Sequence, residues 1–170
     1  MLAVRVLVGI EDTKGSKSMR KSTRVFAVGA AVAMAALATG CAAPGKQVLS
    51  TDKIYPAIGP YSQMTASGGT IYLSGVLPLN QAANAIVGTT IEEQTRLVLT
   101  LIGEKLKSQG LSHDDVLMST VYMKDLNDFA KMNQVYGEFF KNKPPARATV
   151  QVARIPRDAL IEIAVVAARR

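Results

Sequence analysis

The end of the chain holds the stretch that decides the fold. It reads PPARATVQVARIP over residues 144–156 and, two residues later, ALIEIAVVA over residues 159–167. The first segment alternates Thr149 and Gln151 with Val150 and Val152, which predicts a half-buried strand. The second is an almost unbroken apolar run, which predicts a strand buried on both faces. A turn at Pro156 joins the two strands, and together they are expected to close the domain.

Two charged residues interrupt this stretch. Arg147 opens the first strand, and Glu162 lies inside the apolar run of the second. An ionised carboxylate is too costly to bury alone, so we expect Glu162 to be paired, protonated or lining a wet cleft. The plainer alternative places Glu162 on a solvated strand face and Arg147 on the surface.

The positive charge of the chain is concentrated at its start. Of the formal net charge of +7 over 170 residues, residues 1–40 carry six basic and two acidic side chains, a net +4, and the rest carry fourteen and eleven, a net +3. No basic cluster is interleaved with aromatic residues, and there is no Trp. This distribution argues against a nucleic-acid partner.

Residues 1–40 have the pattern of an export signal. A basic segment from Met19 to Arg24 precedes an apolar run over residues 25–37 that is too short for a permanent membrane span. A start at Met19 would suit this pattern better than Met1, because Glu11 and Asp12 interrupt the preceding residues.

Small residues then lead directly to the single cysteine, Cys41, and resemble a bacterial lipobox. The resemblance implies lipidation of Cys41, a tether over residues 41–47, a domain over residues 48–170, and a lipid-anchored protein at the periplasmic face of the cell envelope. A plain secretory signal is the alternative. Beyond Cys41 no cysteine remains for disulfide or metal-thiolate chemistry.

The intervening residues predict an α+β domain. Strands are expected from residue 58, over residues 70–75 after a turn at Gly68 and Gly69, and over residues 115–124. A Thr90–Glu93 capping box predicts a helix to about Lys107, and a second helix is expected over residues 127–140. The order β-β-α-β-α-β-β predicts a mixed sheet with two helices on one face. We expect the other face to be buried in an oligomer.

Few residues are suited to catalysis. His113, the only histidine, lies in a polar segment and is expected to be exposed, which leaves no catalytic triad. There is no HExxH, phosphate-binding or Rossmann motif, so neither a metal nor a cofactor is expected. Asn133 is unusual because it falls within the apolar stripe of the second helix, where an amide needs a structural partner or a ligand.

Several motifs occur in an order that resembles the Rid family, formerly grouped with YjgF and known as enamine/imine deaminases. They are residues 58–63, 72–75, 94–96, 120–122, 125–129, 133–136, 139–140, 145–147 and 152–154. The resemblance implies a chorismate-mutase-like fold, a homotrimer with clefts between subunits, and cofactor-free hydrolysis of 2-aminoacrylate and other 2-imino acids to 2-keto acids and ammonia.

The resemblance also implies roles for individual residues. The position of Arg147 would hold the substrate carboxylate through a bidentate contact, and that of Glu162 would activate the attacking water. The remaining matched positions are expected to line the cleft and bind substrate. They are Tyr61, Ser74, Gly75, Asn133 and Thr149.

Four residues depart from the family pattern and bear on whether turnover is retained: Val76, Thr100, Thr149 and Ala164. Two other functions are therefore alternatives to the deaminase. A non-catalytic protein of this fold could bind a small carboxylate or act as a holdase in the envelope. A nuclease is disfavoured by the charge distribution.

Overall fold

The computed structural model describes residues 45–169. The predicted leader, its start at Met19 and the lipidation of Cys41 lie outside the described residues. In the described part of the chain, six strands and two α-helices alternate with short 3₁₀ turns. They are β1 (Gln47–Leu49), β2 (Met64–Ser67), β3 (Thr70–Val76), α2 (Ile91–Lys107), η1 (His113–Asp115), β4 (Val116–Met123), η2 (Leu126–Asp128), α3 (Phe129–Phe139), β5 (Ala146–Gln151), η3 (Pro156–Asp158) and β6 (Ile161–Ala168).

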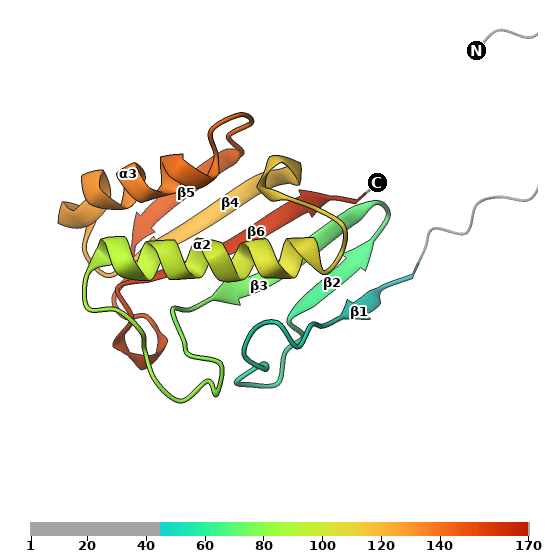
Figure 1. The fold of residues 1–170 in the computed structure, drawn as a ribbon, viewed down its shortest axis with the longest axis horizontal. Helices are drawn as coiled ribbons and strands as arrows, with labels where there is room; N and C mark the ends of the chain where they lie inside the picture. The colour runs from blue at the N-terminus through green and yellow to red at the C-terminus, as the bar shows by residue number, and fades with distance from the viewer. Residues whose placement is uncertain (1–44, 170) are drawn as a thin grey trace, which may run out of the picture. The chain divides into compact units, whose positions relative to one another are not determined.

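The strands form one mixed sheet in the order β1-β2-β3-β6-β4-β5. All neighbours are antiparallel except β4 and β5, which are parallel. The connections β3-α2-β4 and β4-α3-β5 step across the sheet in the same direction. Such crossover connections are almost always right-handed. Two right-handed connections that run in the same direction across a sheet place their helices on the same face of the sheet. Figure 1 shows α2 and α3 side by side over that face, so the predicted α+β architecture is confirmed.

The helices begin where the sequence predicts. The Thr90 side chain accepts a hydrogen bond from the Glu93 amide, and the Glu93 carboxylate accepts one in return from the Thr90 amide. This pair satisfies two amides that the first helical turn leaves free. The buried face of α2 then packs on the sheet through Val98, Leu99 and Ile102, each fully buried.

The strand predictions need four corrections. β2 begins at Met64 rather than at residue 58, because residues 58–63, which include Gly59 and Pro60, form bends. β1 was not predicted, since three residues are too few to show alternation. The predicted burial of β6 on both faces is wrong for the single chain. Its buried residues alternate with partly exposed ones.

The difference in β6 follows from the layers. Ile161, Ile163 and Val165 face the helices and are buried, whereas alternate residues lie on a face that the described chain leaves open. On the same face Tyr72 is 51% exposed and Val150 is 44% exposed. β5 was expected to be half-buried, but it is an edge strand and most of its residues are exposed.

Candidate active site

Arg147 lies on the helix side of the sheet. On β5 it is opposite Ser119 of β4, which is fully buried under the helices. Its Cζ lies 4.6 Å from the ring centroid of Tyr136 and 5.7 Å from that of Phe129, both on α3. These cation–π contacts hold the guanidinium without using its N–H donors. Within residues 45–169 Arg147 makes no hydrogen bond or ion pair, so its donors are free for a ligand.

A cavity of about 470 Å³ opens beside this arginine. Asn133 lines it from α3, and Pro144 and Pro145 line it from the segment just before β5. The Asn133 side chain is half-buried and has no hydrogen-bond partner in the described part of the chain. The amide that the sequence places in the apolar stripe therefore lies at the Arg147 cavity.

Three buried hydroxyls surround Arg147. The side-chain oxygens of Thr149, Ser119 and Tyr136 are buried, and within residues 45–169 none has a well-formed hydrogen bond. Burial raises the pKa of Tyr136, while the nearby Ser119 hydroxyl and the Arg147 charge act in the opposite direction. Buried polar groups are normally satisfied, so these hydroxyls indicate that a polar ligand or further protein belongs here.

Glu162 lies on the opposite side of the sheet. It is paired with Tyr122 across the β6–β4 ladder, on the open face. Its side chain has no hydrogen bond or ion pair among the described residues, and burial raises its pKa. A carboxylate in this condition is a stronger base than one in water.

A cavity of about 220 Å³ surrounds the Glu162 side chain. Three more residues predicted for the cleft line it: Tyr61, Ser74 and Gly75. Gly75 is needed for close approach, because a Cβ at this position would lie 2.8 Å from the Glu162 Cδ. Any larger residue would displace the carboxylate.

The predicted site residues therefore form two groups. The first, the Arg147 half-site, contains Arg147, Asn133 and Thr149, and the second, the Glu162 half-site, contains Glu162, Tyr61, Ser74 and Gly75. Because adjacent side chains on a strand point to opposite faces, the sheet separates the two groups. A single described chain brings together the members of each half-site but not the two half-sites.

Hydrogen bonds fix the Glu162 half-site. The Tyr55 hydroxyl accepts from the Leu77 amide at 2.8 Å and donates to the Leu77 carbonyl at 3.2 Å, and burial raises the pKa of Tyr55 to about 12. The Ser74 Oγ donates to the Ser62 carbonyl at 2.6 Å. These contacts link the segment before β2 to the end of β3.

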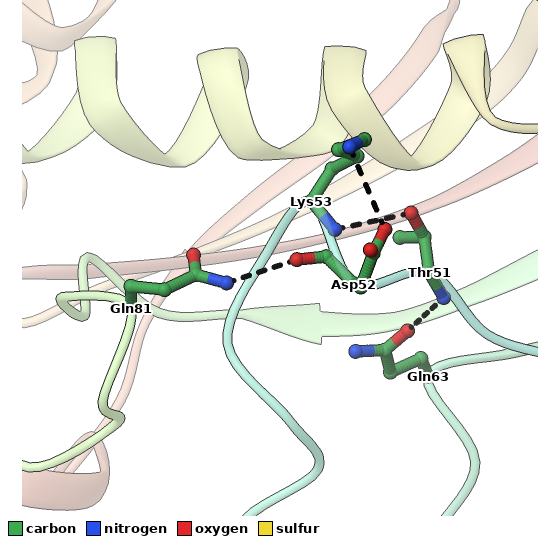
Figure 2. Close-up of polar contacts among 5 residues, drawn as sticks. All are labelled: Thr51, Asp52, Lys53, Gln63 and Gln81. Carbon is green, nitrogen blue, oxygen red and sulfur yellow. Dashed lines mark hydrogen bonds and ion pairs between the residues drawn. The ribbon is translucent and has the colours of Figure 1, made fainter.

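Gln63 extends this network to the start of the domain. Its Oε1 accepts from the Thr51 amide at 2.8 Å, and its Nε2 donates to the Tyr55 carbonyl at 2.9 Å. Figure 2 shows Gln63 and Gln81 reaching the segment around Asp52 from two sides, with the Gln81 amide donating to the Asp52 carbonyl. The wall that carries Tyr61 is thus anchored at several points.

His113 is not exposed, contrary to the prediction. Its ring packs against those of Phe139 and Phe140, with centroids 5.4 and 5.3 Å away, and its Nε2 is 3.0 Å from the Leu99 carbonyl oxygen. Burial lowers its pKa. The polar residues around it concealed this role, since only the fold brings α2 and α3 against its ring.

The four residues that depart from the family pattern lie in different parts of the fold. Val76 is fully buried and pairs with Ile163 on the helix side. Thr100 is exposed on α2 and donates to the Arg96 carbonyl. Ala164 is half-buried on the open face, opposite Thr120. Of the four, only Thr149 carries one of the unsatisfied hydroxyls near Arg147.

Residues 45–169 contain no cluster of three or more His, Cys, Asp or Glu side chains that could hold a metal ion. They also contain no helix with the length and apolar character that a membrane span requires.

Known proteins resemble this chain over most of the described residues. The model of the family described as Endoribonuclease L-PSP matches residues 51–169. A RutC family protein of Saccharolobus solfataricus is 49% identical over 122 residues, which cover 72% of this chain and 97% of that protein. The human 2-iminobutanoate/2-iminopropanoate deaminase is 39% identical over 122 residues, covering 72% of this chain and 89% of its own length. The crystal structure of E. coli TdcF with bound serine is 36% identical, with a TM-score of 0.68, over 73% of this chain and 99% of that one.

Proposed function

The chain belongs to the Endoribonuclease L-PSP family, and from this premise we propose that it hydrolyses 2-imino acids to 2-keto acids and ammonia without a cofactor. The human relative is named as a deaminase of 2-iminobutanoate and 2-iminopropanoate. The observation that carries the proposal is the chemistry of the two half-sites. Among residues 45–169, one offers a guanidinium without hydrogen-bond partners beside hydroxyl donors, and the other offers a partly desolvated carboxylate without a partner.

The Arg147 half-site suits the substrate carboxylate. A guanidinium presents two parallel N–H donors that match the two oxygens of a carboxylate. The hydroxyls of Thr149 and Ser119 would supply further donors, and Asn133 an amide. A solved relative holds serine, which carries such a carboxylate.

The Glu162 half-site suits the hydrolytic step. Glu162 would accept a proton from water as the water oxygen bonds to the carbon of the protonated imine, giving a neutral carbinolamine. The protonated Glu162 would then return the proton to the amine. The C–N bond would break and ammonia would leave, while the carbinolamine hydroxyl gives its proton to Glu162 as the ketone forms. The raised pKa of Glu162 favours both transfers.

The reaction needs both half-sites at one substrate. We propose that neighbouring copies in a homotrimer complete the site, with Arg147 from one copy facing Glu162 of the next. The exposed apolar side chains of the open sheet face, Tyr72 and Val150, support an assembly that covers them.

The family name raises RNA cleavage as another activity, but the site favours it less. Metal-free RNA cleavage commonly relies on histidine as acid or base. The single histidine of this chain, His113, packs against two aromatic rings and lies close to the Leu99 carbonyl.

The test of the proposed function uses imino acids made in place by an amino-acid oxidase and trapped with semicarbazide. The protein should lower the yield of semicarbazone by consuming the imine first. An unchanged yield across several side chains would refute the deaminase. Retained binding of a 2-keto acid in that case would support the non-catalytic carboxylate-binding protein instead.

We also propose, from the leader sequence alone, that the chain is exported and lipid-anchored through Cys41 at the periplasmic face of the envelope. Expression with a clickable fatty acid should label the wild type but not Cys41→Ser, and only the wild type should fractionate with membranes. Equal labelling or equal fractionation of the two would refute the anchor.

A further inference from the structure

Lys105 is the only charged residue that is buried among residues 45–169, with 3% of its surface exposed. It lies on the helix face that packs against the sheet, and it has no carboxylate partner in the described part of the chain. Its Nζ lies 3.3 Å from the carbonyl oxygen of Gln63 and 3.5 Å from that of Ser74. A lysine here is unexpected, because an apolar residue would continue the stripe of α2.

The two carbonyls belong to the frame of the Glu162 half-site. Register in the β3–β6 ladder shifts between Leu73 and Val76, so Ser74 and Gly75 fall outside its regular pairing. The Ser74 amide instead donates to the Gln63 carbonyl at 3.2 Å, the same oxygen that Lys105 approaches. The ammonium thus lies where the segment before β2 meets the irregular end of β3.

This junction lies directly against the Glu162 side chain. Gly75 follows Ser74 directly and approaches Glu162 so closely that no Cβ fits. A shift of the Ser74 carbonyl would therefore change the gap between the Gly75 backbone and the carboxylate. A displacement of about 1 Å is enough to lower the rate of catalysis strongly.

The burial of Lys105 destabilises the folded state. Burial lowers the pKa of Lys105 to about 8, because the charged form loses its hydration. Two long hydrogen bonds to carbonyls offset this only in part. Residues that reduce stability and yet are present often serve the active site.

We infer that Lys105 is a positioning residue of the active site, whose ammonium holds the Gln63 and Ser74 carbonyls and so fixes Gly75 against Glu162. The inference rests on the proposed function for its kinetic consequences. It concerns a residue that touches neither substrate nor Glu162, and that acts through the backbone of the half-site.

The test compares Lys105→Met, which keeps the length of the side chain, with the control Lys107→Met, which removes an exposed lysine of the same helix. In full-length protein, Lys105→Met should lower kcat about tenfold with KM within about twofold, since Arg147 still binds the substrate. Lys105→Gln, which keeps a donor, should recover most of kcat. A kcat for Lys105→Met equal to that of Lys107→Met would overturn the inference.

Two measurements separate positioning from a general loss of folding or of function. The melting temperature of Lys105→Met should be at least that of the wild type, and a parallel loss of stability and kcat would contradict positioning. The amide resonances of Ser74 and Gly75 should titrate near pH 8 in the wild type but not in Lys105→Met. This titration tests the inference even if the wild type has no deaminase activity. If the two amide resonances of the wild type do not titrate near pH 8, the inference is refuted.

Discussion

The two half-sites differ in how the chain holds them. The Arg147 half-site rests on ring contacts at the exposed edge strand β5, with buried hydroxyls left unsatisfied. The Glu162 half-site is bound together by hydrogen bonds through Tyr55, Gln63 and Ser74. Among residues 45–169, the first leaves polar groups without partners, whereas the second is a cavity whose walls are joined by hydrogen bonds.

This difference indicates a division of labour. Unsatisfied donors beside a free guanidinium are suited to capture a carboxylate, whose binding would supply the missing acceptors. A cavity that holds Glu162 with a raised pKa is suited to proton transfer, because the carboxylate must lie within hydrogen-bond distance of the reacting group. The predictions below separate binding from chemistry by changing one half-site at a time.

The largest effect is expected at Arg147. Arg147→Lys keeps the charge but loses the fork of donors, so kcat/KM should fall about 100-fold or more, mainly through KM. The melting temperature should hardly change because the side chain is exposed. Arg96→Lys, at a surface ion pair with Glu138, is the matched control and should retain activity. Equal kinetics for the two variants would refute the role of Arg147.

Glu162→Gln should act on chemistry rather than binding. Loss of the base should lower kcat about 100-fold or more while 2-keto acid binding persists. In the wild type, the raised pKa means that activity is lost as pH falls through a value above that of an ordinary carboxyl. The variant should lack this acid limb, as pH profiles of kcat would show. A retained limb would assign the base to another group.

Adding a methyl group at one glycine of each half-site compares how tightly the two half-sites are packed. In Gly75→Ala the new Cβ should displace the Glu162 carboxylate, lowering kcat about tenfold and destabilising the fold by about 1–3 kcal/mol. In Gly137→Ala, beside the Arg147 cavity, the Cβ meets open space and should stabilise α3 by up to about 1 kcal/mol. Chemical denaturation and kinetics of both variants provide the measurement. Comparable losses at the two positions would contradict the contrast in rigidity.

The last prediction concerns the pH dependence of stability at Lys105. The unfolded lysine keeps its proton up to about pH 10.5, but the folded one loses it near pH 8, so wild-type stability should rise with pH across this window. Relative to Lys105→Met, the rise should be at most about 3 kcal/mol. Urea denaturation at pH 7 and pH 10 measures it. A stability difference independent of pH would show that Lys105 is not buried as a charge.

The parts of the fold that the sequence predicts correctly are those that depend on local signals. The capping box at Thr90, the turn at Gly68 and the alternation along β4 place their elements because each depends on neighbouring residues. The family resemblance read from the motifs is likewise confirmed. β1, the exposure of β5 and the surroundings of His113 depend on distant segments, which single-sequence patterns do not contain.

The candidate site shows the same limit. The awkward positions of Glu162 and Asn133 could be identified from their apolar surroundings, and both now line cavities. Their separation by the sheet required the register of β4, β5 and β6. The burial of Lys105 could not be predicted, because a lysine on a helix is usually solvated and only the packing against Gln63 and Ser74 buries it.

The central claim, that two copies complete one site, can be tested by mixing inactive variants. Arg147→Ala and Glu162→Gln chains are refolded together at equal concentration, so that oligomers form at random. If each site takes Arg147 from one copy and Glu162 from its neighbour, about a quarter of the sites should regain both residues, and about a quarter of wild-type activity should return. Wild type refolded with the Arg147→Ala, Glu162→Gln double variant is the control for exchange. No recovered activity, with exchange demonstrated, would contradict the account, because it would place both residues of each site on one chain.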